Sequence, residues 1–179
     1  EPVTITGGKV VGTSTYGVDL IGNTLTVLGG EVYGETDGIH SISHVVLGTT
    51  EDAISKTTPL IQGKHNGLTT TGTFYFFDGI LKGKNVARDG QVNLVPDASM
   101  VVDDYEFIDR VEYKTQYLEA YGNWLRVGDQ EFNSLYAAQS VIADYGTVYV
   151  TKDVRINFEQ SLVAGKHVTF DLDGHQVIS

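Results

Sequence analysis

Three acidic side chains lie close enough in the sequence to suggest a cation site. Asp103, Asp104 and Asp109 fall within one short segment, and Arg110 follows directly. Carboxylate oxygens are the ligands that Ca²⁺ takes in proteins, so these three aspartates are the predicted calcium ligands. With Arg110 as a nearby base, such a site would suit a polysaccharide lyase. A solvated, turn-forming acidic segment is the simpler interpretation, and we favour it.

Aromatic side chains suggest a second kind of chemistry. Tyr113, Tyr117 and Trp124 lie within twelve residues, and exposed rings can stack on sugars, so these three are the predicted carbohydrate-binding residues. Tyrosine is also common in strands, where it lies half-buried on the sheet. We therefore favour a structural role for the tyrosines.

The histidines do not predict a metal site. His40 and His44 are four residues apart in a segment with strand patterning, which places them about 13 Å apart on one face. That distance is too long for shared zinc coordination. The sequence also contains no Gly-x-Ser-x-Gly motif, no phosphate-binding loop and no dinucleotide fingerprint. No catalytic residue is predicted, and we do not expect an enzyme.

Composition excludes several classes of protein. The 179 residues carry 12 basic and 23 acidic side chains, a net charge of −11, which is unsuited to nucleic acid. With no cysteine, disulfide scaffolds and thiolate zinc sites are excluded. Hydrophobic residues make up 41% of the chain, enough for a core, and no apolar run is long enough to span a membrane.

A repeated unit organises the first half of the chain. The pattern apolar-x-[Gly/Asp]-Gly-x-apolar-x-Gly occurs at residues 5–12, 27–34 and 76–83, and residues 59–63 hold part of a further copy. The first two copies are offset by 22 residues at every position. The glycines that we predict to be structural corners are Gly8, Gly12, Gly30, Gly34, Gly63, Gly79 and Gly83.

This repeat predicts a right-handed parallel β-helix, an all-β solenoid. Short alternation at residues 3–5 and 25–27 indicates strands, and a unit of about 22 residues must stack on its neighbours to bury its apolar face. A β-sandwich is the alternative, but it does not predict one corner motif at a fixed offset. Extra residues of the longest coil are expected as a loop around residues 49–53.

The sequence predicts three successive segments in the chain. Residues 1–92 form the β-helix repeat segment, and residues 93–131 form an irregular or antiparallel connecting segment. Residues 132–179 are expected to hold one short helix and the start of a further β-helix segment. The helix is predicted over residues 133–145, with Asn133 or Ser134 as its N-cap and Gly146 after it.

Two stretches resemble a known group of proteins. Residues 59–63 with 72–84, and residues 132–138 with 148–154 and 165–174, are similar to β-helical repeat segments of very large surface proteins of Gram-positive bacteria. The resemblance implies a pectin-lyase-like right-handed β-helix that is exported and has an adhesive or structural role. It carries over no catalytic residue. The chain is shorter than such proteins, which suggests a piece of a longer protein or a short member.

The expected function follows from these points. We expect a non-catalytic structural or adhesive module of a bacterial surface protein, extracellular or at the cell surface. Open solenoid ends would let copies associate end to end into fibres, and a polysaccharide or a host or cell surface is the other expected partner. The alternative is a polysaccharide-binding module or a polysaccharide-lyase-like enzyme on a β-helix.

Overall fold

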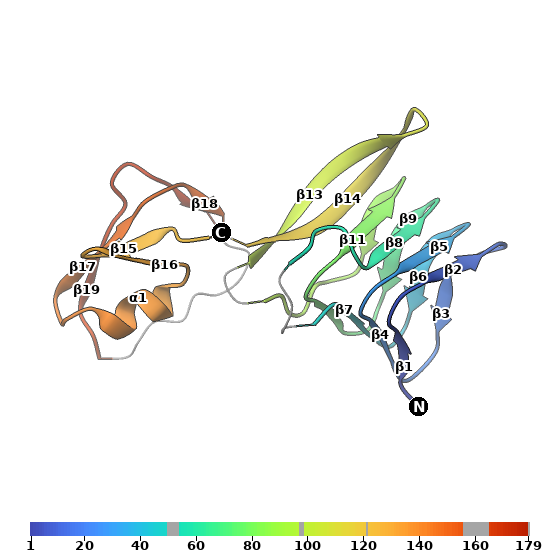
Figure 1. The fold of residues 1–179 in the computed structure, drawn as a ribbon, viewed down its shortest axis with the longest axis horizontal. Coiled ribbons are helices and arrows are strands. Elements are labelled where there is room, and N and C mark those ends of the chain that lie inside the picture. Colours follow the sequence, from blue (N-terminus) through green and yellow to red (C-terminus); the bar gives the residue numbers. More distant parts are fainter. Residues whose placement is uncertain (50–53, 97–98, 121, 156–164, 179) are drawn as a thin grey trace. The chain divides into compact units, whose positions relative to one another are not determined.

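The computed structural model describes residues 1–49, 54–96, 99–120, 122–155 and 165–178, which are nearly all β (Figure 1). Two compact units are present. Unit 1 contains residues 1–96 and 101–119, and unit 2 contains residues 99–100 and the described residues from 120 onwards. The predicted connecting segment, residues 93–131, is divided between these units.

Unit 1 is a parallel β-helix of four coils, each with three short strands. Each strand of the first three coils pairs in parallel with the strand three places later in the chain, which gives three parallel sheets. Sheet A contains β1 (Val3–Ile5), β4 (Thr24–Val27), β7 (His44–Leu47) and β10 (Phe74–Phe76). Sheet B contains β2 (Lys9–Gly12), β5 (Glu31–Gly34), β8 (Leu60–Gly63) and β11 (Ile80–Gly83). Sheet C contains β3 (Val18–Leu20), β6 (Asp37–Ser41), β9 (Asn66–Thr70) and β12 (Val86–Asp89).

This arrangement confirms the predicted parallel β-helix over the β-sandwich. The repeat offset is the coil length, because Lys9 pairs with Glu31 and Gly12 with Gly34. The loop expected around residues 49–53 lies outside the described residues, except for residue 49.

The core of unit 1 consists of columns of apolar side chains. In the strands of sheet B the buried and less buried residues alternate, as expected for strands with one face inside. Parallel pairing then brings equivalent residues into register, so that Val32, Ile61 and Leu81 lie in one fully buried column. Phe74 and Phe76 stack with their ring centroids 5.3 Å apart in the same core.

The closing glycines of the repeat form a second kind of column. Gly12, Gly34, Gly63 and Gly83 are paired in register along sheet B. A β-carbon at Gly34 would lie 1.8 Å from the backbone oxygen of Asp37, and one at Gly12 would lie 1.7 Å from the backbone oxygen of Tyr16. The chain turns so closely behind sheet B that only glycine fits these positions.

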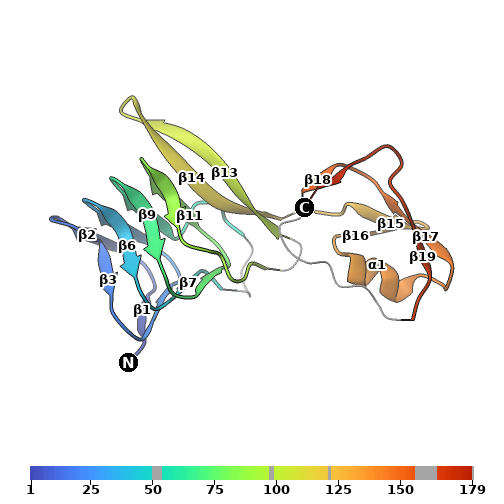
Figure 2. The same ribbon diagram turned by 180° about the vertical axis from the view of Figure 1, so that it is seen from behind.

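A long hairpin follows the last coil. It consists of β13 (Ser99–Ile108) and β14 (Val111–Ala120), and β14 pairs with β11 in antiparallel fashion. The two turn residues, Asp109 and Arg110, have φ values of 49° and 67°, which fit a tight hairpin turn. Figures 1 and 2 both show the tip of this hairpin reaching past the coils.

Unit 2 contains a short helix and a second set of strands. The sheet order is β16 (Gln130–Phe132), β15 (Leu125–Val127), β17 (Gly146–Val150) and β19 (Val168–Asp171), and β18 (Val154–Arg155) pairs with β20 (Val177–Ile178). Gly146 pairs in parallel with Val168, 22 residues later. This equals the offset between the first two coils of unit 1 on sheet B, and the predicted further β-helix segment would use the same spacing.

The predicted helix is confirmed as α1 (Leu135–Val141), with Ser134 as its N-cap accepting a hydrogen bond from the Ala137 N–H at 3.2 Å. It ends before Gly146, because Ile142 is already extended. The Lys166 ammonium donates to the backbone oxygens of Gln139 and Ile142 at 2.6 and 2.7 Å. These bonds satisfy carbonyls that the end of a helix leaves unpaired.

We predict that Gly34→Ala destabilises unit 1, because the added β-carbon meets backbone rather than a movable side chain. Overpacking of this kind costs about 1–3 kcal/mol or more of unfolding free energy. Urea unfolding followed by circular dichroism measures the change. Gly7→Ala is the matched control, since a β-carbon there has no atom within 4 Å. Equal stability of the two variants would contradict the steric role of the closing glycines.

Candidate functional site

The three predicted calcium ligands are not brought together. Asp103 and Asp104 are neighbours on β13, so their side chains leave opposite faces, and Asp109 lies at the hairpin turn, roughly 17 Å further along. Asp103 accepts a hydrogen bond from the Gln116 amide at 2.7 Å, and Asp104 accepts one from the Tyr105 N–H at 2.8 Å. In the described part of the chain, no group of three His, Asp or Glu side chains is placed to share a metal ion.

The basic side chain linked to Asp103 is that of Arg88, through Gln116, rather than that of the predicted Arg110. The Arg88 Nε donates to the Gln116 side-chain oxygen at 2.7 Å, and Gln116 in turn donates to Asp103. Burial lowers the pKa of Arg88, while the charges of Asp103 and Asp89 oppose that change. The sequence contains a signal for Arg88, because the residues in register with it in the earlier coils, Val18, Ile39 and Leu68, are all apolar.

The predicted carbohydrate-binding rings have little free surface. Trp124 is 1% exposed in the core of unit 2, where its indole N–H donates to the Asn133 backbone oxygen at 2.8 Å. Tyr113 is 7% exposed in unit 1, and the Lys84 ammonium lies 5.8 Å from its ring centroid. Tyr117 lies on β14 with the Lys56 ammonium 5.6 Å from its ring centroid. A sugar could not stack on Trp124 or Tyr113 as they are placed here.

A shallow hollow of about 270 Å³ lies on the outer side of sheet B. Its walls include Lys9, Tyr33, Glu35, Lys64 and Tyr113. Lys9 lies over the Tyr33 ring at 4.2 Å, and Lys64 pairs with Glu35 at 2.5 Å. Burial, with a smaller contribution from the Glu31 carboxylate, raises the pKa of the Tyr33 hydroxyl. The charged groups here are therefore satisfied by one another rather than directed at a ligand.

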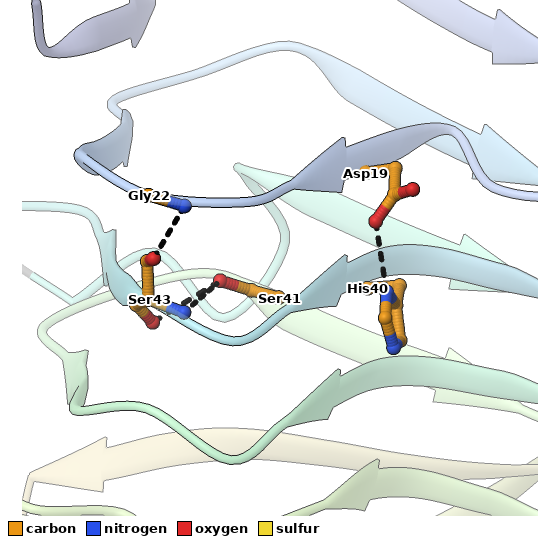
Figure 3. Close-up of polar contacts among 5 residues, drawn as sticks. All are labelled: Asp19, Gly22, His40, Ser41 and Ser43. Atoms are coloured by element: carbon orange, nitrogen blue, oxygen red, sulfur yellow. Dashed lines mark hydrogen bonds and ion pairs between the residues drawn. The ribbon is translucent and has the colours of Figure 1, made fainter.

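Histidine–aspartate pairs link successive coils on the outside of both units. Figure 3 shows the His40 ring facing the Asp19 carboxylate on the neighbouring strand, at 2.8 Å, and His40 also stacks on Tyr16. The same pairing recurs in unit 2, where the two pairs are His167–Asp144 at 3.3 Å and His175–Asp153 at 3.2 Å. Each histidine meets an aspartate 21 to 23 residues earlier, which is one coil.

The described serines near His40, Ser41 and Ser43, are engaged with the backbone. Ser41 follows it on β6, so the two side chains leave opposite faces of the strand. The Ser41 hydroxyl donates to the Ser43 backbone oxygen at 3.1 Å and accepts from the Ser43 N–H at 3.0 Å. Ser43 in turn accepts from the Gly22 N–H at 2.7 Å (Figure 3). These hydroxyls fix the corner between sheets C and A.

Asp78 anchors a loop, a role that the sequence around it indicates only weakly. It is 7% exposed, and one carboxylate oxygen accepts from the N–H groups of Ser55, Lys56 and Gly79 at 2.8, 3.3 and 2.6 Å. The Ser55 hydroxyl is 3.2 Å from the same oxygen. Asp78 replaces the first glycine of the repeat, and that substitution was the only available signal.

The comparisons with known proteins find no match among family models, curated proteins or solved structures. The architecture itself defines the class, which is a parallel β-solenoid. Within the described residues, no helix has the length and apolar character needed to cross a membrane.

We predict that Asp78→Ala loosens the loop at residues 54–58, because it removes the acceptor of several hydrogen bonds. Leaving such donors unpaired costs about 1–3 kcal/mol of unfolding free energy. Urea unfolding and amide exchange of Ser55 and Lys56 measure the effect. Asp104→Ala is the control, since Asp104 is exposed. Unchanged exchange at Ser55 would contradict the anchoring role.

A pH dependence is expected at the start of β20. The backbone N–H of Gln176, followed by the side chain of His175, lowers the pKa of Asp153. A carboxylate with a lowered folded pKa stabilises the fold above its unfolded pKa, and that contribution is lost as the pH falls through the folded value. The Gln176 amide resonance should therefore titrate with a midpoint below that of an ordinary aspartate. Asp153→Asn should abolish this titration, and a midpoint at the ordinary value would contradict the prediction.

Proposed function

We propose that this chain is a non-catalytic structural or adhesive module of an exported bacterial surface protein. One observation carries the proposal: the polar side chains that could have done chemistry are engaged in holding one coil to the next. Three pairs join successive coils: Asp19 with His40, Glu35 with Lys64, and Lys9 with Glu31. A stack held in this way is suited to carrying mechanical load and to holding other parts of a protein apart, rather than to catalysis.

The location outside the cell is part of the proposal. The absence of cysteine fits either a cytosolic protein or a Gram-positive surface protein that does not rely on disulfides. The charge of −11 fits the solvated outer face of an exported solenoid. The resemblance of residues 59–63, 72–84 and 132–138 to repeat segments of Gram-positive surface proteins supports the same location.

The polysaccharide-directed alternative has weaker support. A sugar-binding face needs free ring surfaces, and Lys9 and Lys84 lie over the Tyr33 and Tyr113 rings. A lyase needs a base beside a cation site, whereas the Asp103 carboxylate already accepts a hydrogen bond from Gln116.

We also propose that coil ends associate with one another. In the described chain, β1, β2 and β3 are the outermost strands of sheets A, B and C. Val3 and Val11 on these strands are 46% and 54% exposed. An outermost strand offers unpaired N–H and C=O groups that another strand can pair with, so this end supports contact with a second copy.

We predict that the purified chain associates as its concentration rises, and that Val3→Lys with Val11→Lys returns it to the monomer. Lysine on an outermost strand opposes strand pairing through charge and hydration. Analytical ultracentrifugation measures the masses. Tyr136→Lys is the control, because Tyr136 is 61% exposed on α1 of unit 2. A monomeric wild-type chain at every concentration would refute the association.

A further inference from the structure

The two ends of the coil stack in unit 1 differ in what covers them. At the first coil, the apolar side chains of Ile5, Val10 and Val18 are only partly buried. At the last coil, other parts of unit 1 cover the core. Leu118 on β14 is fully buried against it, and residues 93 and 94 exchange backbone hydrogen bonds with β10, from Asn93 to Phe74 and from Phe76 to Leu94.

The hairpin strand β14 occupies the place where a fifth strand of sheet B would lie. Every neighbouring pair among β2, β5, β8 and β11 is parallel, whereas β14 pairs with β11 in antiparallel register, Ile80 with Tyr117 and Lys82 with Thr115. The hydrogen-bonding edge of β11 is thus already taken. A strand from another copy cannot reach it without displacing β14.

On sheet C, a column of apolar side chains also ends in polar groups at the last coil. Val18, Ile39 and Leu68 are in register on sheet C, and Arg88 stands at the next position of that column. Arg88 bonds to Gln116, which stands in register with the buried Leu81. Another coil stacked here would have to bury the Arg88 charge, which is costly unless the charge keeps its partners.

The outer strand of the hairpin carries its own charges. β13 is the last strand of its sheet and bears Asp103, Asp104 and Glu106. Glu106 is paired with Lys82 at 2.5 Å, which ties the hairpin to the last coil. Charged side chains on an outermost strand discourage pairing with another chain, so the exposed edge of β13 is a poor substitute for the edge of β11.

We propose that the β13–β14 hairpin is a cap that prevents a second copy from stacking on the last coil. This inference rests on the proposed association of coil ends, and it limits the number of copies that associate. With its last coil capped, the coil stack of unit 1 can meet that of a second copy only through its first coil. Such a contact uses the same surface on both copies and closes with two-fold symmetry, so association stops at two copies rather than continuing into a fibre.

The test compares the wild-type chain with two variants that release the cap. Leu118→Asp places a charge in the buried contact, and Arg88→Ala with Gln116→Ala removes the polar network while keeping Leu118. Val111→Asp is the matched control, because it adds the same charge to β14 at a side chain that is 39% exposed, whereas Leu118 is fully buried. Amide exchange identifies release, since β11 should lose protection while β5 and β8 keep theirs.

Analytical ultracentrifugation and electron microscopy give the outcome. Wild type and Val111→Asp should contain species no larger than two copies, and at least one released variant should form longer assemblies. Wild-type assemblies longer than two copies would overturn the cap, and so would the finding that neither released variant forms anything larger than wild type. A monomeric wild type with a self-associating released variant would refute contact through the first coil and still support the cap.

Discussion

Parallel pairing in strict register is the constraint on which the rest of this structure depends. Gly12, Gly34, Gly63 and Gly83 are register partners along sheet B, so the same tight turn recurs at the equivalent position of every coil. Any side chain at these positions would collide with backbone. The apolar columns are a consequence, since register places equivalent residues on top of one another and the alternation of the strands directs every second one inward.

The same register explains where the polar side chains are used. A residue on the outer face lies about 4.8 Å from its equivalent in the next coil, which lets side chains of opposite charge or with hydrogen-bonding partners pair across coils. His40 meets Asp19, and Lys64 meets Glu35, in this way. Each exposed pair contributes about 0–1 kcal/mol, so their value lies in fixing the register rather than in providing most of the stability.

The sequence determines the coils more directly than the surroundings of the candidate site residues, for one physical reason. Corner glycines and alternating strands are local patterns that recur along the chain, so the step from Gly12 to Gly34 already defines one coil. The partners of Asp103, Asp78 and Trp124 depend on which distant segments meet. Asp103 is bonded to Gln116 across a hairpin, Asp78 holds a loop 22 residues earlier, and Trp124 lies in the core of unit 2. Residue type alone could not distinguish these structural roles from ligand binding.

Nothing in a regular solenoid limits the number of its coils, because each coil presents to the next the same kind of surface that the previous coil presents to it. Ending the stack therefore requires a change in the repeat itself. Here three changes coincide: Arg88 replaces an apolar residue in its column, β14 reverses the strand direction, and Leu118 covers the core. The loss of the sequence template after residue 92 has the same cause. Residues that terminate a stack cannot keep the pattern that extends it, so the segment with the weakest repeat is the one that gives unit 1 a defined length.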